Sequence, residues 1–129
     1  DVYKRQNIND SRCNLLLNLD IYYEVNLNLP QYSDLNFVSN SVYVPDVGNG
    51  GIIIVNSGTG FLAWDASDPN HEILPCSILN INGLEATTSC VQQNTYSLIT
   101  GQSVGTVLNC TLKAYRVESV GNVLIVSSF

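Results

Sequence analysis

The chain has 129 residues, of which 45% are hydrophobic and 12% are charged, and its formal net charge is −6. This composition is typical of one globular domain and excludes a disordered chain. Five basic residues also disfavour nucleic-acid binding, because phosphate recognition depends on clustered Lys and Arg side chains.

The first six residues, DVYKRQ, resemble the in-frame translation of a sequencing adapter, and we exclude residues 1–6 from the fold. Without Asp1, Lys4 and Arg5, which together carry a charge of +1, the formal net charge becomes −7. The natural N-terminus is then expected upstream, where a signal peptide or lipid anchor would stand. We expect residues 7–20 to form an N-terminal segment and residues 21–129 to form a single domain.

Short runs of β-branched and aromatic residues, separated by Gly, Asn, Pro or Asp, occupy most of the remaining chain. Apolar and polar residues alternate over 21–28 and predict a half-buried strand, which Pro30 ends. Residues 29–38 have room for one or two helical turns. Further strands are predicted at 42–44, 52–55, 61–64, 77–81, 96–99, 112–117 and 123–126. No apolar run approaches the roughly 18 residues that a transmembrane helix needs, so we expect no transmembrane segment.

Two loop-like segments carry the most specific pattern: WDASDPNHEILPC at 64–76 and ATTSCVQQNTYSLITG at 86–101. A hairpin-like stretch at 51–65 precedes them, and a second one at 112–126 follows them. This order resembles the Rieske iron–sulfur domain, with its leading hairpin, two cluster loops and closing hairpin. The resemblance implies an all-β, antiparallel sandwich or barrel, with the loops at 65–76 and 87–95 forming a smaller tip.

The family's cofactor is a [2Fe–2S] cluster held by two Cys thiolates and two His nitrogens. In the first loop the family's C-x-H positions fall on Asp68 and Asn70, with His71 one place late. In the second loop two registers are open: the ligand pair falls either on Cys90 and Gln93 or on Thr88 and Val91. The chain has one His in total, so we expect no cluster and no other cofactor.

Many Rieske proteins join their two loops by a disulfide, and the resemblance makes Cys76 and Cys90 the candidate pair. Such a bridge closes a loop of about 15 residues and contributes about 3 kcal/mol in the chain-entropy estimate. The alternative is two buried thiols that pack as small apolar groups. Cys13 and Cys110 have no evident partner in the sequence, and we expect Cys110 to be buried. Four Cys in a chain of this kind favour an oxidising compartment at the cell envelope, periplasmic or surface-exposed, with lipid anchoring as one route.

Three other kinds of site, a hydrolase site, a zinc site and a calcium site, are weighed against a solvated loop without any site. His71 could serve a hydrolase, but a lone His is more often solvated than catalytic, and we assign no catalytic residue. Asp68, His71, Cys76 and Cys90 could hold zinc, yet their spacing matches no standard pattern, and we assign no metal. Asp65, Asp68 and Glu72 lack the spacing of a calcium loop, so we interpret them as a solvated acidic loop.

These observations leave two functional hypotheses. The first is a Rieske-like envelope protein that has lost its cluster ligands and acts, without enzymatic activity, as a binding or structural module for an unknown protein partner. The second is a Rieske [2Fe–2S] electron-transfer protein, or the ferredoxin component of an oxidoreductase. Iron content and visible colour separate the two.

Overall fold

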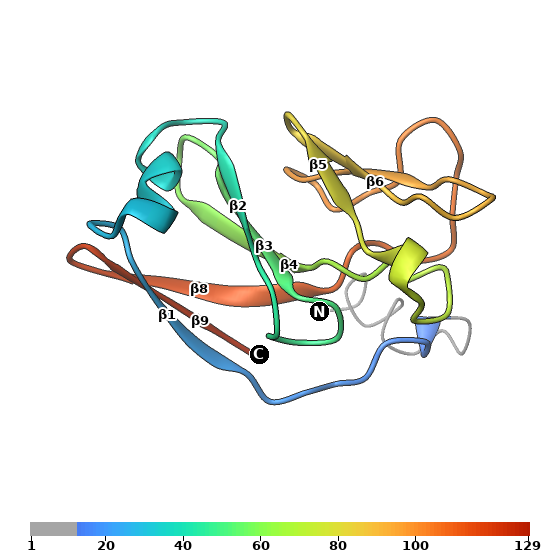
Figure 1. Ribbon diagram of the computed structural model, residues 1–129, viewed down its shortest axis with the longest axis horizontal. Coiled ribbons are helices and arrows are strands. Elements are labelled where there is room, and N and C mark those ends of the chain that lie inside the picture. Colours follow the sequence, from blue (N-terminus) through green and yellow to red (C-terminus); the bar gives the residue numbers. More distant parts are fainter. Residues whose placement is uncertain (1–12) are drawn as a thin grey trace.

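Two antiparallel sheets form the computed structural model, which describes residues 13–129 (Figure 1). The larger sheet has six strands in the order β1-β9-β8-β4-β3-β2, and the smaller has three in the order β5-β6-β7. In the described part the elements are β1 (Tyr22–Asn26), η2 (Pro30–Asn36), β2 (Ser41–Val44), β3 (Ile52–Asn56), β4 (Phe61–Asp65), η3 (Pro75–Ser77), β5 (Asn80–Asn82), β6 (Glu85–Thr87), β7 (Thr95–Ser97), β8 (Ala114–Val120) and β9 (Val123–Ser127), where η denotes a 3₁₀ helix. The expected all-β, antiparallel architecture is confirmed.

Strand β3, which lies between β4 and the edge strand β2, carries a continuous apolar run because it is buried on both faces. Ile52 and Ile54 face a core enclosed by the curled six-stranded sheet, together with Val25 and Leu124. The alternate residues of β3 face a second core, between the large and the small sheet. Side chains alternate between the two faces of a strand, so four consecutive β-branched residues supply both cores.

The second core fixes the small sheet, and with it the two loops of interest, against the large sheet. Its members include Trp64 of β4, Leu79 before β5, Ala86 of β6 and Tyr96 of β7. The indole nitrogen of Trp64 donates a 2.7 Å hydrogen bond to the carbonyl oxygen of Leu98, so this large side chain is satisfied as well as buried. Figure 1 shows the small sheet beside β2, β3 and β4, with η3 at its lower end.

Most predicted strands are present, with two differences in the small sheet. Residues 77–81 do not form one strand: η3 ends at Ser77, and β5 begins only at Asn80. The side chain of Ser77 explains the first difference, because its hydroxyl oxygen accepts a 3.0 Å bond from the backbone nitrogen of Leu74 and favours a tight turn. The second difference is β6, a three-residue strand that we did not predict.

The adapter-like residues 1–6, and residues 7–12 of the expected N-terminal segment, lie outside the described residues. Within residues 13–129, no helix has the length and apolar character that crossing a membrane would require.

Candidate functional site

Asp68 lies in the first loop, between β4 and η3, and its side chain is only 1% exposed. Its Oδ1 accepts a 2.9 Å bond from the backbone nitrogen of Asn70 and a second bond from the hydroxyl of Tyr96. Its Oδ2 accepts a 2.8 Å bond from Nδ2 of Asn94. Both carboxylate oxygens are therefore held by protein donors, and our interpretation of Asp68 as part of a solvated acidic loop is wrong.

Asn70 extends this network to the segment before β8. Its Nδ2 donates to the hydroxyl oxygen of Tyr96 at 2.7 Å and to the carbonyl oxygen of Cys110 at 2.9 Å. Its Oδ1 accepts a 3.1 Å bond from the backbone nitrogen of Cys110. A single amide thus joins the first loop, β7 and residue 110.

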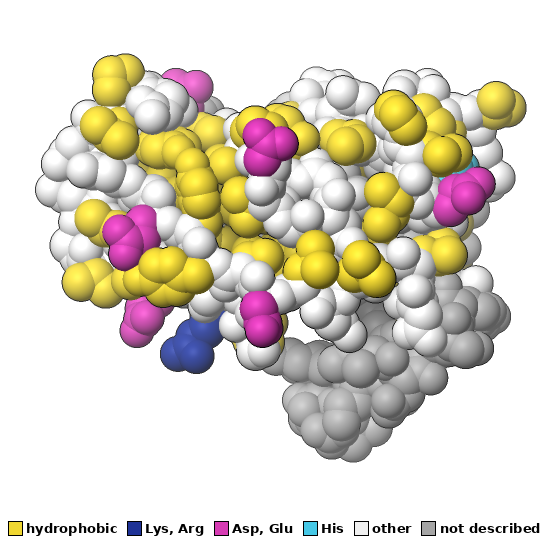
Figure 2. Space-filling view, turned by 60° about the horizontal axis from the view of Figure 1, so that its bottom comes forward, with side chains coloured by type: hydrophobic (Ala, Val, Ile, Leu, Met, Phe, Trp, Pro, Cys, Tyr) yellow, Lys and Arg dark blue, Asp and Glu magenta, His cyan; other side chains and the backbone are white. Residues whose placement is uncertain are grey.

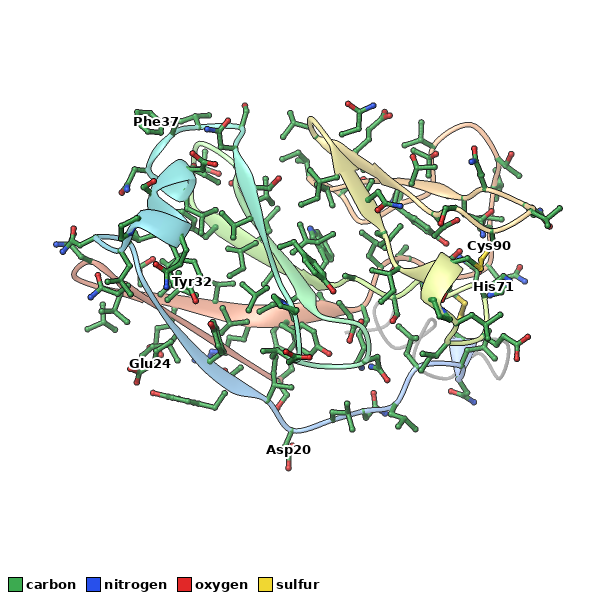
Figure 3. The ribbon with its side chains drawn as sticks, viewed as in Figure 1. Asp20, Glu24, Tyr32, Phe37, His71 and Cys90 are labelled. Carbon is green, nitrogen blue, oxygen red and sulfur yellow. A yellow bond between two sulfur atoms is a disulfide. The ribbon has the colours of Figure 1, made fainter. Side chains whose placement is uncertain are left out.

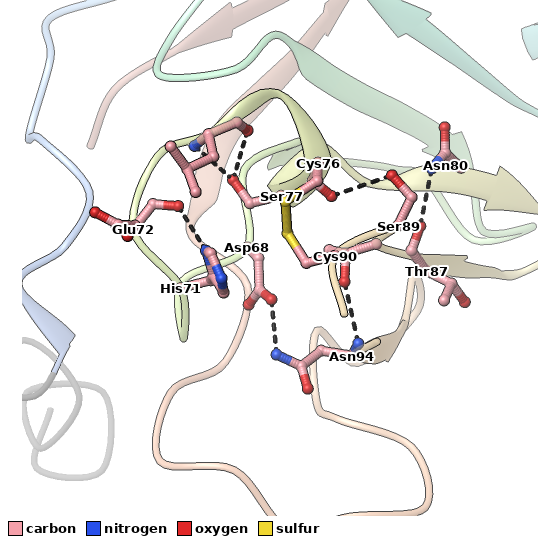
Figure 4. Close-up of a disulfide and its surroundings, with 12 residues drawn as sticks. Asp68, His71, Glu72, Cys76, Ser77, Asn80, Thr87, Ser89, Cys90 and Asn94 are labelled. Atoms are coloured by element: carbon pink, nitrogen blue, oxygen red, sulfur yellow. Dashed lines mark hydrogen bonds between the residues drawn. A yellow bond between two sulfur atoms is a disulfide. The ribbon is translucent and has the colours of Figure 1, made fainter. Parts of the chain in front are cut away.

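The second loop closes on itself through Thr88 and Asn94, both of which are buried. The backbone nitrogen of Thr88 donates to the carbonyl oxygen of Asn94 at 3.0 Å, and Oγ1 of Thr88 accepts a 3.1 Å bond from the backbone nitrogen of Asn94. Since the Asn94 side chain also donates to Asp68, the chain Thr88–Asn94–Asp68–Tyr96–Asn70 is continuous. We call these five residues the tip network. Figure 4 shows the bond between Asp68 and Asn94, and Figure 3 shows the position of this region by its labelled neighbours His71 and Cys90.

A disulfide joins Cys76 of η3 to Cys90 of the second loop, and the S–S bond is visible in Figure 4. The backbone nitrogen of Ser89 also donates to the carbonyl oxygen of Cys76 at 2.9 Å, so the two loops are connected covalently and by the backbone. This is the pairing that the Rieske resemblance implied. Within that resemblance it selects the register in which the second ligand pair falls on Thr88 and Val91.

A second disulfide joins Cys13 to Cys110, which are 97 residues apart in the sequence. From the sequence Cys13 has no evident partner, and Cys110 is expected to be buried, as it is. The bridge ties the N-terminal segment to the residue whose backbone holds Asn70. The tip network is therefore bounded by one disulfide on each side.

The remaining candidate positions lie outside this network. Val91 and Gln93 are exposed on the second loop. His71 is half-buried, and its Nδ1 lies 2.8 Å from the carbonyl oxygen of its neighbour Glu72. Among residues 13–129, the hydrogen bond of the His71 ring is to the backbone of Glu72 and not to a nucleophilic side chain, and Figure 4 shows the ring directed toward Glu72.

The tip also offers fewer metal-ligating side chains than the sequence suggests. The zinc set considered above loses Cys76 and Cys90 to their disulfide. Within residues 13–129, no group of three or more His, Cys, Asp or Glu side chains is arranged to hold a metal ion.

Asp65, at the end of β4, forms a second buried carboxylate centre and is 0% exposed. Its Oδ2 accepts bonds from the backbone nitrogen of Asn49 at 2.8 Å and from the hydroxyl of Tyr115 at 2.6 Å. Its Oδ1 accepts a 3.0 Å bond from the backbone nitrogen of Ser67. Gly48 has a positive φ of 72°, and a Cβ there would lie 2.8 Å from Oδ2 of Asp65, so the loop before β3 can approach the carboxylate closely only with glycine. Asp65 is thus structural, and its assignment to a solvated loop is wrong.

The two tyrosines that donate to these carboxylates resist ionisation. Burial, the largest cause, raises the pKa of Tyr96 far above its ordinary value, and the bond to Asp68 acts in the same direction. Burial and the bond to Asp65 raise the pKa of Tyr115 likewise. Both phenols therefore remain protonated donors at pH values where an exposed tyrosine ionises.

The raised pKa values of Tyr96 and Tyr115 predict that the fold loses stability in alkali. Above about pH 10 the unfolded chain releases the two phenolic protons while the folded chain keeps them, so the free energy of unfolding falls as pH rises. Each tyrosine contributes a slope of about 1.4 kcal/mol per pH unit, and the contribution is fully present below about pH 10. Urea denaturation at several alkaline pH values measures the slope. Tyr96→Phe is expected to reduce the slope by the share of one tyrosine, about 1.4 kcal/mol per pH unit, and an unchanged slope in that variant would contradict the assignment.

Comparisons with known proteins give fold-level similarities alone. No family model and no curated protein matches the sequence. Among solved structures, the ferredoxin of carbazole 1,9a-dioxygenase from Nocardioides aromaticivorans IC177 is 17% identical, with a TM-score of 0.48, over 74% of this chain and 93% of its own. A structure from Mycobacterium tuberculosis, described as an NADH-dependent nitrite reductase small subunit, is 16% identical, with a TM-score of 0.49, over 86% of this chain and 97% of its own. A third structure, described as a nitrite reductase NADPH small subunit, is 22% identical, with a TM-score of 0.45, over 81% of this chain and 97% of its own. Similarities of this strength assign no ligand, partner or activity to the chain.

Proposed function

We propose that this chain is a Rieske-like protein of the cell envelope that acts as a non-redox binding or structural module and has no enzymatic activity. The observation that carries the proposal is the state of Asp68. It stands at the first cluster-ligand position of the resemblance, and protein donors hold both of its carboxylate oxygens. A side chain held in this way is a structural crosslink rather than a metal ligand.

The available donors also do not fit a [2Fe–2S] cluster. Such a cluster requires two thiolates and two imidazoles, whereas this chain has one His. All four Cys are joined in disulfides. The four positions that correspond to ligands in the selected register carry Asp68, Asn70, Thr88 and Val91, which offer neither thiolate nor imidazole.

The tip network supplies a physical replacement for a metal crosslink. A cluster would join the two loops through its ligands; here Asp68 of the first loop is joined to Asn94 of the second and to Tyr96 of β7 by side-chain bonds. Buried polar networks of this kind rigidify a structure when every member is satisfied. Ile73, Leu74 and Val91 are exposed on the two loops that the network fixes, and this supports a role in binding a protein partner.

The proposed location follows from the disulfides. Two disulfides in a small domain are typical of an oxidising, extracytoplasmic compartment. The cell envelope, periplasmic or surface-exposed, meets this condition, and lipid anchoring would keep the module at a membrane. We propose a protein partner and exclude nucleic acid from the proposal, because the chain has five basic residues and a net charge of −6.

Iron analysis tests the proposal. We expect the purified protein to be colourless, to contain no stoichiometric iron, and to give no cluster signal in electron paramagnetic resonance after reduction with dithionite. Reconstitution with ferrous iron and sulfide, followed by desalting, is expected to leave the protein iron-free. Two irons per chain with a Rieske-type signal would instead support the electron-transfer hypothesis and overturn the non-redox proposal.

A further inference from the structure

A groove opens in the large sheet where β4 and β8 separate. The two strands are paired at only two positions, Ala63 with Tyr115 and Trp64 with Ala114. Beyond these pairs the start of β4 continues along β3, whereas β8 continues along β9. The gap between the diverging strands has a volume of about 280 Å³. It is formed by residues other than those of the tip network.

The lining of this groove is mostly apolar, and Arg116 is its one charged side chain. Because Trp64 stands opposite Ala114, strand alternation places Leu62 and Arg116 on the same face as this pair. Phe129, which is 86% exposed, also lines the groove. The Trp64 indole is held by its bond to Leu98, so this wall is preformed. A preformed apolar surface with one polar group is the usual composition of a small-molecule site.

Arg116 supplies that polar group. Residues 13–129 contain two basic side chains, and the other one, Lys113, donates a 2.6 Å bond to Oδ1 of Asn18. No ion pair joins Arg116 to any acidic residue of the described part, although Glu118 lies on the same face of β8 two residues further along. On the face of the molecule in Figure 2, few Lys or Arg side chains (dark blue) are visible and many hydrophobic side chains (yellow) are. A guanidinium at the rim of an apolar groove matches a ligand with a carboxylate head and an apolar tail.

We propose that this groove binds a small aliphatic monocarboxylate, with the tail against Leu62, Trp64 and Phe129 and the carboxylate on Arg116. A volume of about 280 Å³ lies at the small end of the range for ligand pockets, which suits a short ligand such as octanoate. The opening spans only the first two residues of β4, Phe61 and Leu62, which is too short for a peptide to pair as an added strand. The size of the opening therefore favours a small molecule.

Trp64 provides a direct measurement because it is the only tryptophan of the chain. Titration of the intact protein with octanoate is expected to change the tryptophan fluorescence saturably, with a Kd of about 1 mM or tighter. Octylammonium, which has a similar tail and the opposite charge, is expected to bind several-fold more weakly. Raising the salt concentration from about 0.02 M to about 0.5 M is expected to weaken octanoate binding, since the charge contact is exposed to solvent.

Two variants separate the head and tail contacts. Arg116→Gln is expected to weaken octanoate binding about three- to fivefold, the range of a solvent-exposed charge contact, whereas Lys113→Gln, which removes the same charge elsewhere, leaves it unchanged. Ala114→Phe fills the groove from an exposed position and is expected to abolish the saturable change while circular dichroism remains that of the parent protein. The proposal is overturned by any of three results: no saturable change with octanoate, equal affinity in Arg116→Gln, or full binding in Ala114→Phe. The iron content of the tip affects none of these measurements.

Discussion

Replacing both Cys13 and Cys110 by serine is expected to lower the free energy of unfolding by about 4 to 5 kcal/mol. The bridge joins residues 97 positions apart, so its loss frees most of the chain in the unfolded state. It also releases the backbone of Cys110, which makes two hydrogen bonds to Asn70. A loss of this size is a large part of the stability of a typical small domain.

The second disulfide provides the matched control. Cys76 and Cys90 are 14 residues apart, and their double serine variant is expected to lose about 3 kcal/mol, because the shorter loop restricts the unfolded chain less. Urea denaturation of both variants, with and without reductant, measures the difference. A larger loss in the Cys76/Cys90 variant than in the Cys13/Cys110 variant would show that local contacts, rather than loop length, decide the stability.

The strands of the large sheet were predictable because their local signal agrees with their tertiary role. Residues 52–55 are four consecutive β-branched residues, and the structure buries all of them. The alternating pattern over 21–28 corresponds to β1, an edge strand with one face on the core. The strands of the small sheet carry less information: β6 has three residues, one of them a charged Glu85, and a tertiary core rather than local propensity stabilises it.

The burial of the two aspartates could not be predicted from neighbouring residues. Asp65 and Asp68 lie in a polar segment with Glu72, and a segment of this composition predicts a solvated loop. Their partners come from elsewhere in the chain: Tyr115 lies 50 residues from Asp65, and Tyr96 lies 28 residues from Asp68. A carboxylate is buried only where donors surround it, and no local pattern reports that arrangement.

The Cys13–Cys110 pairing was missed for a different reason. The resemblance supplied a partner for Cys76 and Cys90, but it supplied none for the other two cysteines. An even number of Cys in an oxidising compartment is itself a signal that the two remaining cysteines form a second bridge. That reasoning identifies the pair by elimination and says nothing about its position beside Asn70, which only the fold supplies.

Asp68→Ala is expected to lower the free energy of unfolding by about 3 to 5 kcal/mol, because it leaves two buried donors and one part-buried donor without their acceptor. These donors are the backbone nitrogen of Asn70, Nδ2 of Asn94 and the hydroxyl of Tyr96. Tyr96→Phe removes one donor to Asp68 and also the hydroxyl oxygen that accepts from Nδ2 of Asn70, and it is expected to lose about 1 to 3 kcal/mol. Asp34→Ala, at an exposed position on η2, is the control and is expected to change stability by less than about 0.5 kcal/mol.

The double variant Asp68→Ala/Tyr96→Phe makes the comparison decisive. Because the two side chains contact each other directly, their effects are expected to be less than additive, with a coupling of about 1 kcal/mol or more. Urea denaturation of the parent, the two single variants and the double variant gives this value. Additive losses would mean that Asp68 and Tyr96 stabilise the fold separately. A coupled loss means that the two loops are held as one unit by hydrogen bonds, which is the property that a tip without a metal crosslink requires.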